Sequence, residues 1–188
     1  MQKLIFISVV ALSLVGCEKF QQEREVKEYI KSYVKDPSSV QFRNVSGQCG
    51  EFNAKNGYGA YTGFDRYIYR NGNLYTQSAW AEKEENDTYS DENLFIVAFD
   101  EICTKGNTVY NLDDCRSEAS YMSSVFERRL ENIFDKNWEM SFFSKNSAEL
   151  KAKGKRLVDY AYNLPRSETN IQFVKAQAFR KCLAKGTI

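Results

Sequence analysis

The hydrophobic period of the chain changes after about residue 104, and this change limits the fold more than any other feature of the sequence. Between residues 40 and 104, apolar residues come in short runs rich in β-branched and aromatic side chains, which are typical of strands. After that point they recur every three or four residues, as on one face of a helix. We therefore expect an α+β protein, in which a helix on a small antiparallel sheet (residues 22–104) is followed by a helical bundle (residues 112–186).

The first part is expected to begin with a helix over residues 22–35. Val26, Ile30 and Val34 recur at helical spacing there, and Pro37 ends the pattern because the residue before a proline avoids the helical region. Five strands are expected after it, over residues 40–45, 48–54, 64–70, 73–79 and 94–100. Residues 82–92 are acidic and polar, which favours a solvated loop over a calcium site, because the EF-hand pattern is missing.

The clearest local signal is Asn71-Gly72, which separates Tyr67-Ile68-Tyr69 from Leu74-Tyr75. Asparagine and glycine both accept the positive φ that a type I′ turn requires. We therefore predict a tight hairpin whose two strands pair antiparallel.

Three apolar stripes predict helices in the second part. Asn146 with Glu149 forms a capping-box pattern, residues 163–165 stop one helix, Ser167 is expected to cap the next, and Gly186 follows the last. The stripes are Cys115, Ala119, Met122, Phe126, Leu130 and Ile133; Leu150, Leu157, Val158 and Ala161; and Ile171, Val174, Ala178 and Cys182.

The N-terminus has the pattern of an export signal. Lys3 precedes an apolar run of twelve residues, 4–15, which is too short for a transmembrane helix of about 20 residues. The run ends in Leu14-Val15-Gly16-Cys17, which resembles the lipobox of bacterial lipoproteins. This resemblance implies a signal peptide over residues 1–16, diacylglycerol on Cys17, and a lipidated tether over residues 17–25. Glu18 follows the cysteine, so the resemblance implies the outer membrane, facing the periplasm.

The expected mature body is electrically neutral. Cleavage after Gly16 removes Lys3 and no acidic residue, which leaves 25 basic and 25 acidic side chains in 172 residues. Nucleic acid is bound through a basic surface, so no nucleic-acid partner is expected. The predicted membrane contact is the lipid on Cys17, because two acyl chains already anchor a protein stably.

Four cysteines remain in the body, namely Cys49, Cys103, Cys115 and Cys182. An even number in an oxidising compartment predicts two disulfides, and three pairings are open. A zinc site is disfavoured because the chain has no histidine and no CxxC spacing. We therefore expect no metal and no cofactor.

Two strings extend the resemblance to known proteins. DPSSVQFRNV at residues 36–45, followed by CGEFNAKN at 49–56 and GAYTGF at 59–64, is similar to a small exported module of gammaproteobacterial envelope and prophage-associated proteins. The helical part is similar to another uncharacterised exported module. The resemblance implies a fold, and no activity is established for either module.

The expectation that each module carries its own disulfide, together with this resemblance, favours pairing of Cys49 with Cys103 and of Cys115 with Cys182. Cys103 with Cys115 is the rival pair. The bridge between Cys115 and Cys182 could not form in an up-down-up bundle of three full-length helices, because the two residues would lie at opposite ends, beyond the roughly 7 Å that a disulfide allows between α-carbons. It therefore also predicts a short extra helix between Trp138 and Lys145.

Catalytic motifs are missing from the sequence. Without histidine, neither a Ser-His-Asp nor a Cys-His arrangement can form. Glu51 with Asp65 is the one carboxylate pair considered for a cell-wall hydrolase, and solvated charges at a sheet edge are the alternative.

Two segments are candidates for binding. The glycine-rich segment 56–64 carries Tyr58, Tyr61 and Phe64, which could bind a partner or a sugar or could cover the sheet as a structural turn. The basic run 151–156 could contact anionic headgroups or wall polymers, or could be the solvated face of a helix.

These observations predict a lipid-anchored cell-envelope protein that is not an enzyme and that binds an envelope protein or a cell-wall polymer. The alternatives are a carboxylate-dependent cell-wall hydrolase and a prophage-derived exclusion factor or inhibitor.

Overall fold

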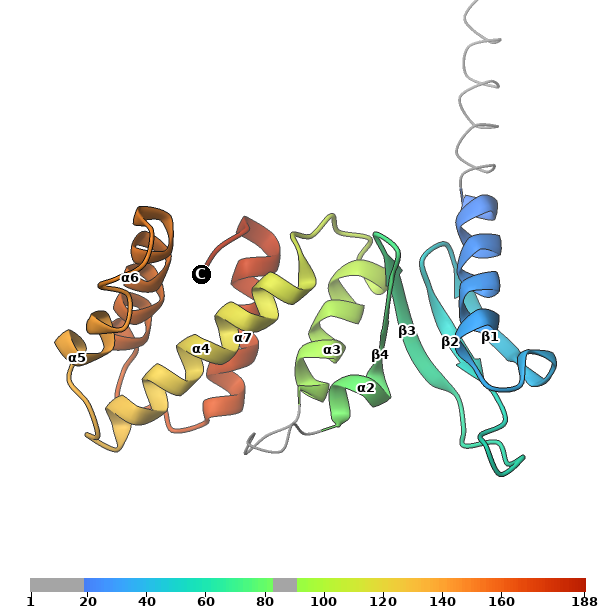
Figure 1. The fold of residues 1–188 in the computed structure, drawn as a ribbon, viewed down its shortest axis with the longest axis horizontal. Coiled ribbons are helices and arrows are strands. Elements are labelled where there is room, and N and C mark those ends of the chain that lie inside the picture. Colours follow the sequence, from blue (N-terminus) through green and yellow to red (C-terminus); the bar gives the residue numbers. More distant parts are fainter. Residues whose placement is uncertain (1–18, 83–90) are drawn as a thin grey trace, which may run out of the picture. The chain divides into compact units, whose positions relative to one another are not determined.

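The fold was analysed in a computed structural model, which describes residues 19–82 and 91–188. The chain divides into two compact units, Met1–Glu82 and Lys83–Ile188. The first unit holds a sheet and the second is helical, so the α+β class predicted from the sequence is confirmed (Figure 1). The division falls earlier in the chain than the expected module boundary at residue 104.

The sheet has four antiparallel strands in the order β1-β2-β3-β4. These are β1 (Gln41–Ser46), β2 (Cys49–Asn53), β3 (Asp65–Arg70) and β4 (Asn73–Thr76), and a 3-10 turn, η1 (Pro37–Ser39), precedes them. All four coincide closely with strands predicted from the alternation of apolar residues, although β4 ends three residues early. Each strand pairs with the next along the chain.

An N-terminal helix covers one face of this sheet (Figure 1). It extends over 19–33 of the described residues, and Val26 and Ile30 pack with Phe52 and Tyr67 from the strands to form the core of the unit. The helix therefore already includes residue 19, within the expected tether of residues 17–25 and ahead of the expected helix start at residue 22. Glu23 ties this segment to the sheet unit by accepting a hydrogen bond from the Gly47 N–H.

The hairpin prediction is confirmed. Arg70 pairs with Asn73, and the two residues between them, Asn71 and Gly72, have φ values of 52° and 77°. Two consecutive positive φ values are the mark of a type I′ turn.

A short helix, α2 (Gln77–Ala81), follows β4 where the strand was expected to continue to residue 79. Thr76 caps it by accepting from the Ala79 N–H. Trp80 is buried and meets the ring of Tyr75 edge-on.

The fifth predicted strand, over residues 94–100, is wrong. This segment forms α3 (Glu92–Phe99), continued by the π-helical turn η2 (Asp100–Thr104). Leu94, Phe95 and Ala98 are fully buried while Ile96 is 44% exposed, which is the pattern of one helical face. A short apolar run has no periodicity of its own that separates a buried strand from a buried helix.

The second unit is completed by α4 (Leu112–Leu130), α5 (Lys136–Ser141), α6 (Ala148–Asn163) and α7 (Ile171–Lys185). Helix α4 packs against both α6 and α7. The stop at residues 163–165 and the left-handed cap at Gly186 are as predicted. Two predicted caps are displaced, because Ser147 caps α6 in place of Asn146, and Asn170 caps α7 in place of Ser167.

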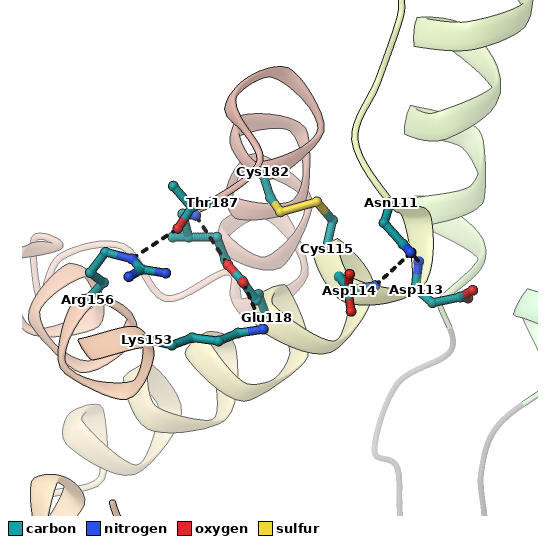
Figure 2. Close-up of a disulfide and its surroundings, with 10 residues drawn as sticks. Asn111, Asp113, Asp114, Cys115, Glu118, Lys153, Arg156, Cys182 and Thr187 are labelled. Carbon is teal, nitrogen blue, oxygen red and sulfur yellow. Dashed lines mark hydrogen bonds and ion pairs between the residues drawn. A yellow bond between two sulfur atoms is a disulfide. The ribbon is translucent and has the colours of Figure 1, made fainter. Parts of the chain in front are cut away.

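Two disulfides are present, as predicted. Figure 2 shows the one that joins Cys115 at the start of α4 to Cys182 near the end of α7, with 5.4 Å between the α-carbons. Cys49 and Cys103 are disulfide-bonded as well. Cys49 belongs to β2 and Cys103 to η2.

The short extra helix that the pairing of Cys115 with Cys182 required is α5. It begins at Lys136, two residues before the predicted range, and leaves Trp138 38% and Phe142 55% exposed.

The expected signal peptide, Cys17 and most of the acidic segment lie outside the described residues. Within the described part, no helix is both long enough and apolar enough to cross a membrane.

Candidate ligand-binding pocket

An open pocket of about 460 Å³ lies at one end of the sheet unit. Three segments of the chain form its walls, all from the first unit: the end of the N-terminal helix at Tyr33–Lys35, the end of β2 with the residues that follow it, and the loop between β2 and β3. Asp65 and Ser78 complete the lining. The pocket therefore lies where the glycine-rich segment meets the last turn of the helix.

Asn53 is the buried polar residue of this pocket. It is the last residue of β2, it is 8% exposed, and its Oδ1 has no hydrogen-bond partner among the described residues. A buried acceptor without a donor costs about 1–3 kcal/mol.

The loop beside Asn53 is a fixed structure. Lys55 and Tyr61 form an isolated antiparallel bridge, and the Asn56 side chain accepts from the backbone N–H groups of Tyr58 and Ala60. The Tyr61 hydroxyl donates to the Ser39 carbonyl at 3.0 Å. These bonds hold the pocket wall in place without a ligand.

Two lysines bring positive charge to the pocket. A Cβ at Gly57 would lie 3.2 Å from the Lys35 Nζ, so the missing side chain leaves room for this ammonium group. Lys35 forms no ion pair with any residue that the structure describes. The Lys55 Nζ lies 5.7 Å from the centre of the Tyr61 ring.

The nearby carboxylates are held by local donors. Asp65 accepts from both the N–H and the hydroxyl of Ser78. The hydrogen bond from Ser38 holds the pKa of Asp36 below its usual value, with a smaller contribution from the charge of Lys55. Lys35, which is exposed, and Lys55 thus line the pocket without an ion pair to any described residue.

The three aromatic residues singled out in the sequence lie around the pocket and do not line it. Tyr58 is 98% exposed, Tyr61 is held against Ser39 and Lys55, and the Phe64 ring lies 4.0 Å from the Arg43 guanidinium carbon. The loop supplies Gly57, Thr62 and Gly63 to the lining instead. Sequence reasoning found the segment but missed Asn53 and Lys35.

The structure does not bring the carboxylates of Glu51 and Asp65 together. Asp65 pairs with Phe52 across the strands, and Glu51 precedes Phe52, so the two carboxylates point to opposite faces of the sheet. Each also has its own partner, because Glu51 is paired with Arg43 and Asp65 with Ser78. This pair lacks the geometry of a glycosidase site.

Buried charges in the second unit are paired with one another. Asp91 accepts from Lys175 at one oxygen and from Arg116 at the other, both at 2.5 Å. Glu139 is fully buried and receives two bonds from Arg128, at 2.8 and 2.9 Å. These groups connect helices, and a paired buried charge of this kind has a structural role.

The basic run 151–156 lies on α6 and is largely engaged within the unit. Lys153 pairs with the buried Glu118, which also accepts from the Ile188 N–H, and Arg156 donates to Thr187 (Figure 2). Lys155 pairs with Asp159. Lys151 lines a smaller pocket together with Met140 and Phe143.

In residues 19–82 and 91–188, no three histidine, cysteine or acidic side chains are grouped so that they could hold a metal ion. The chain matches no protein-family model, and no curated protein or solved structure is significantly similar to it.

Proposed function

We propose that this protein is a lipid-anchored component of the cell envelope whose exported body binds a cell-wall polymer in the pocket at the end of the sheet, without catalysing a reaction. The apolar run that ends in Leu14-Val15-Gly16-Cys17 supports the anchor. The open pocket of about 460 Å³, whose walls are held by the bridge between Lys55 and Tyr61 and by the bond from Tyr61 to Ser39, supports the binding role. Sites of this kind combine a formed cavity with a few placed polar groups.

Cosedimentation with purified peptidoglycan sacculi tests this proposal. The full-length protein in detergent is compared with Thr62→Trp, which fills the pocket from an exposed position of its lining. Ser117→Trp places the same side chain on an exposed position of α4 in the second unit and serves as the matched control. We expect wild type and Ser117→Trp to sediment with the sacculi and Thr62→Trp to remain in the supernatant. Equal retention of all three would overturn the proposal.

A further inference from the structure

We infer that one end of the sheet unit lies against the membrane surface, with Phe20 inserted among the lipid headgroups and the pocket held at the opposite end. The inference rests on the lipid anchor of the proposed function. The contact surface consists of the first turn of the N-terminal helix, the turn around Gly47 and the hairpin turn Asn71-Gly72. Its partner is a phospholipid bilayer.

The chain between the expected lipidated cysteine and the folded unit is very short. The helix already includes residue 19, and the two residues that separate it from position 17 can extend over about 7 Å at most. The helix start is also fixed to the sheet, because the Glu23 carboxylate accepts from the Gly47 N–H at 3.1 Å. A lipid on Cys17 therefore brings the first helical turn, and the sheet with it, to the bilayer surface.

Two turns of the sheet lie at the same end of the unit as the helix start. A Cβ at Gly47 would lie 3.4 Å from the Gln22 side chain, so the turn between β1 and β2 is beside the first helical turns. Cys49, just after this turn, pairs with Ile68, so the hairpin that follows β3 is at this end as well. Figure 1 shows both turns at the end of the sheet where the helix begins.

Phe20 is the large apolar side chain of this end. It is 69% exposed and belongs to the first helical turn, where Lys19 is exposed beside it. Such a pair suits the boundary between headgroups and acyl chains, because the ring leaves water while the ammonium group stays among the phosphates. The lipid on Cys17 supplies the affinity, and Phe20 sets the orientation of the unit.

The pocket lies at the opposite end of the same unit. It is formed by the end of the helix at Tyr33–Lys35 and by the loop between β2 and β3. The helix spans residues 19–33, which corresponds to a length of about 22 Å. Contact at the helix start therefore keeps the pocket away from the lipid, on the side from which a polymer can reach it.

Tryptophan fluorescence in vesicles tests the inference. The full-length lipidated protein, carrying Trp80→Phe and Trp138→Phe, is reconstituted into vesicles of phosphatidylethanolamine and phosphatidylglycerol. Phe20→Trp then places a single tryptophan at the contact surface. Tyr58→Trp is the matched control, because Tyr58 is 98% exposed in the loop at the opposite end.

We expect a phospholipid with a nitroxide near the top of its acyl chain to quench Phe20→Trp several-fold more strongly than Tyr58→Trp. Iodide in the buffer should quench mainly Tyr58→Trp. Near-ultraviolet circular dichroism establishes that both variants are folded.

A second measurement uses the wild-type protein and so does not depend on how the variants fold. The vesicles contain a phospholipid with a diazirine in its acyl chain, and the irradiated protein is digested with trypsin. We expect lipid adducts on the peptide of residues 20–24 and none on the peptide of residues 56–66. Adducts on the second peptide alone would overturn the inference.

The outcomes separate this inference from the proposed anchor. If the protein floats with the vesicles but Phe20→Trp is as open to iodide as Tyr58→Trp, and residues 20–24 carry no adduct, the inference fails while the anchor stands. If Cys17 carries no lipid and the protein does not float with the vesicles, the anchor fails and the inference fails with it.

Discussion

Tyr67 places a phenol hydroxyl in the core of the first unit. The side chain is fully buried, and its hydroxyl has no partner among the described residues. The ring lies across the neighbouring strand from Gly50, where a Cβ would come within 2.6 Å of the hydroxyl oxygen. The sheet accommodates this ring because its cross-strand partner has no side chain.

Burial, together with the charge of Glu23, raises the pKa of Tyr67 from 10.0 to about 12. The unfolded chain therefore loses the phenol proton above pH 10 while the folded chain keeps it. This group's contribution to stability is complete below pH 10 and is lost as the pH rises through about 12, at a rate of at most about 1.4 kcal/mol per pH unit.

Tyr67→Phe should therefore lose less stability than wild type between pH 9 and pH 11, because phenylalanine keeps the ring and has no proton to lose. Urea-unfolding midpoints measured across this range test the effect. Tyr58→Phe is the control, since Tyr58 is 98% exposed. Parallel pH profiles for wild type and Tyr67→Phe would contradict the assignment.

Residues whose conformation depends on their neighbours in the chain could be predicted from the sequence. Asn71-Gly72 was found because the turn needs only two residues that accept positive φ. Asn53 could not be found, because the absence of a hydrogen-bond partner for its side chain depends on three segments that meet only in the folded chain. Lys35 was missed for the same reason, since a lysine after a helix is normally solvated.

Among the elements, the hairpin of β3 and β4 offers the sharpest test. Gly72 has a φ of 77°, which a β-branched side chain resists and asparagine tolerates. Gly72→Val should destabilise the protein by about 1–3 kcal/mol, the usual cost of a strained backbone position.

Gly72→Asn at the same position should cost much less, and thermal unfolding of the two variants gives the comparison. If valine and asparagine at position 72 shift the midpoint of thermal unfolding equally, the positive φ of this turn is not what limits the choice of residue.

The segment 92–99 shows where prediction of elements fails. Its apolar residues are contiguous, so periods of two and of 3.6 fit them equally well. Helix α3 packs against α7, and Leu94, Phe95 and Ala98 are fully buried. That packing decides the helix, and it involves residues about 80 positions further along the chain, as the pair of Asp91 with Lys175 also does.

For the whole molecule, the disulfide between Cys115 and Cys182 closes a large loop. The two residues are 67 positions apart, and a bridge of this span stabilises a fold by roughly 4 kcal/mol in the chain-entropy account. The double variant Cys115→Ser/Cys182→Ser should lower the urea midpoint of the second unit accordingly.

Peptide mapping of the double variant without reduction should still show Cys49 and Cys103 bonded. An unchanged urea midpoint, or a wild-type fragment that links Cys103 to Cys115, would contradict the pairing.

The anchor is the other prediction at this scale, and it stays a prediction because Cys17 lies outside the described residues. Cys17→Ala should lose palmitate labelling, and the protein should be either released from the membrane or stranded there as uncleaved precursor. Globomycin should make the wild type accumulate as uncleaved precursor. Palmitate that persists on the alanine variant would show that another residue is modified.

The chain has two tryptophans, and each unit holds one. Trp80 is 3% exposed and lies edge-on to Tyr75, whereas Trp138 is 38% exposed and stacks on Phe134. Their fluorescence should therefore differ in colour, with Trp80 emitting at the shorter wavelength. Trp80→Phe and Trp138→Phe each leave a single tryptophan. The unfolding of each unit can then be followed by the fluorescence of the tryptophan that it holds.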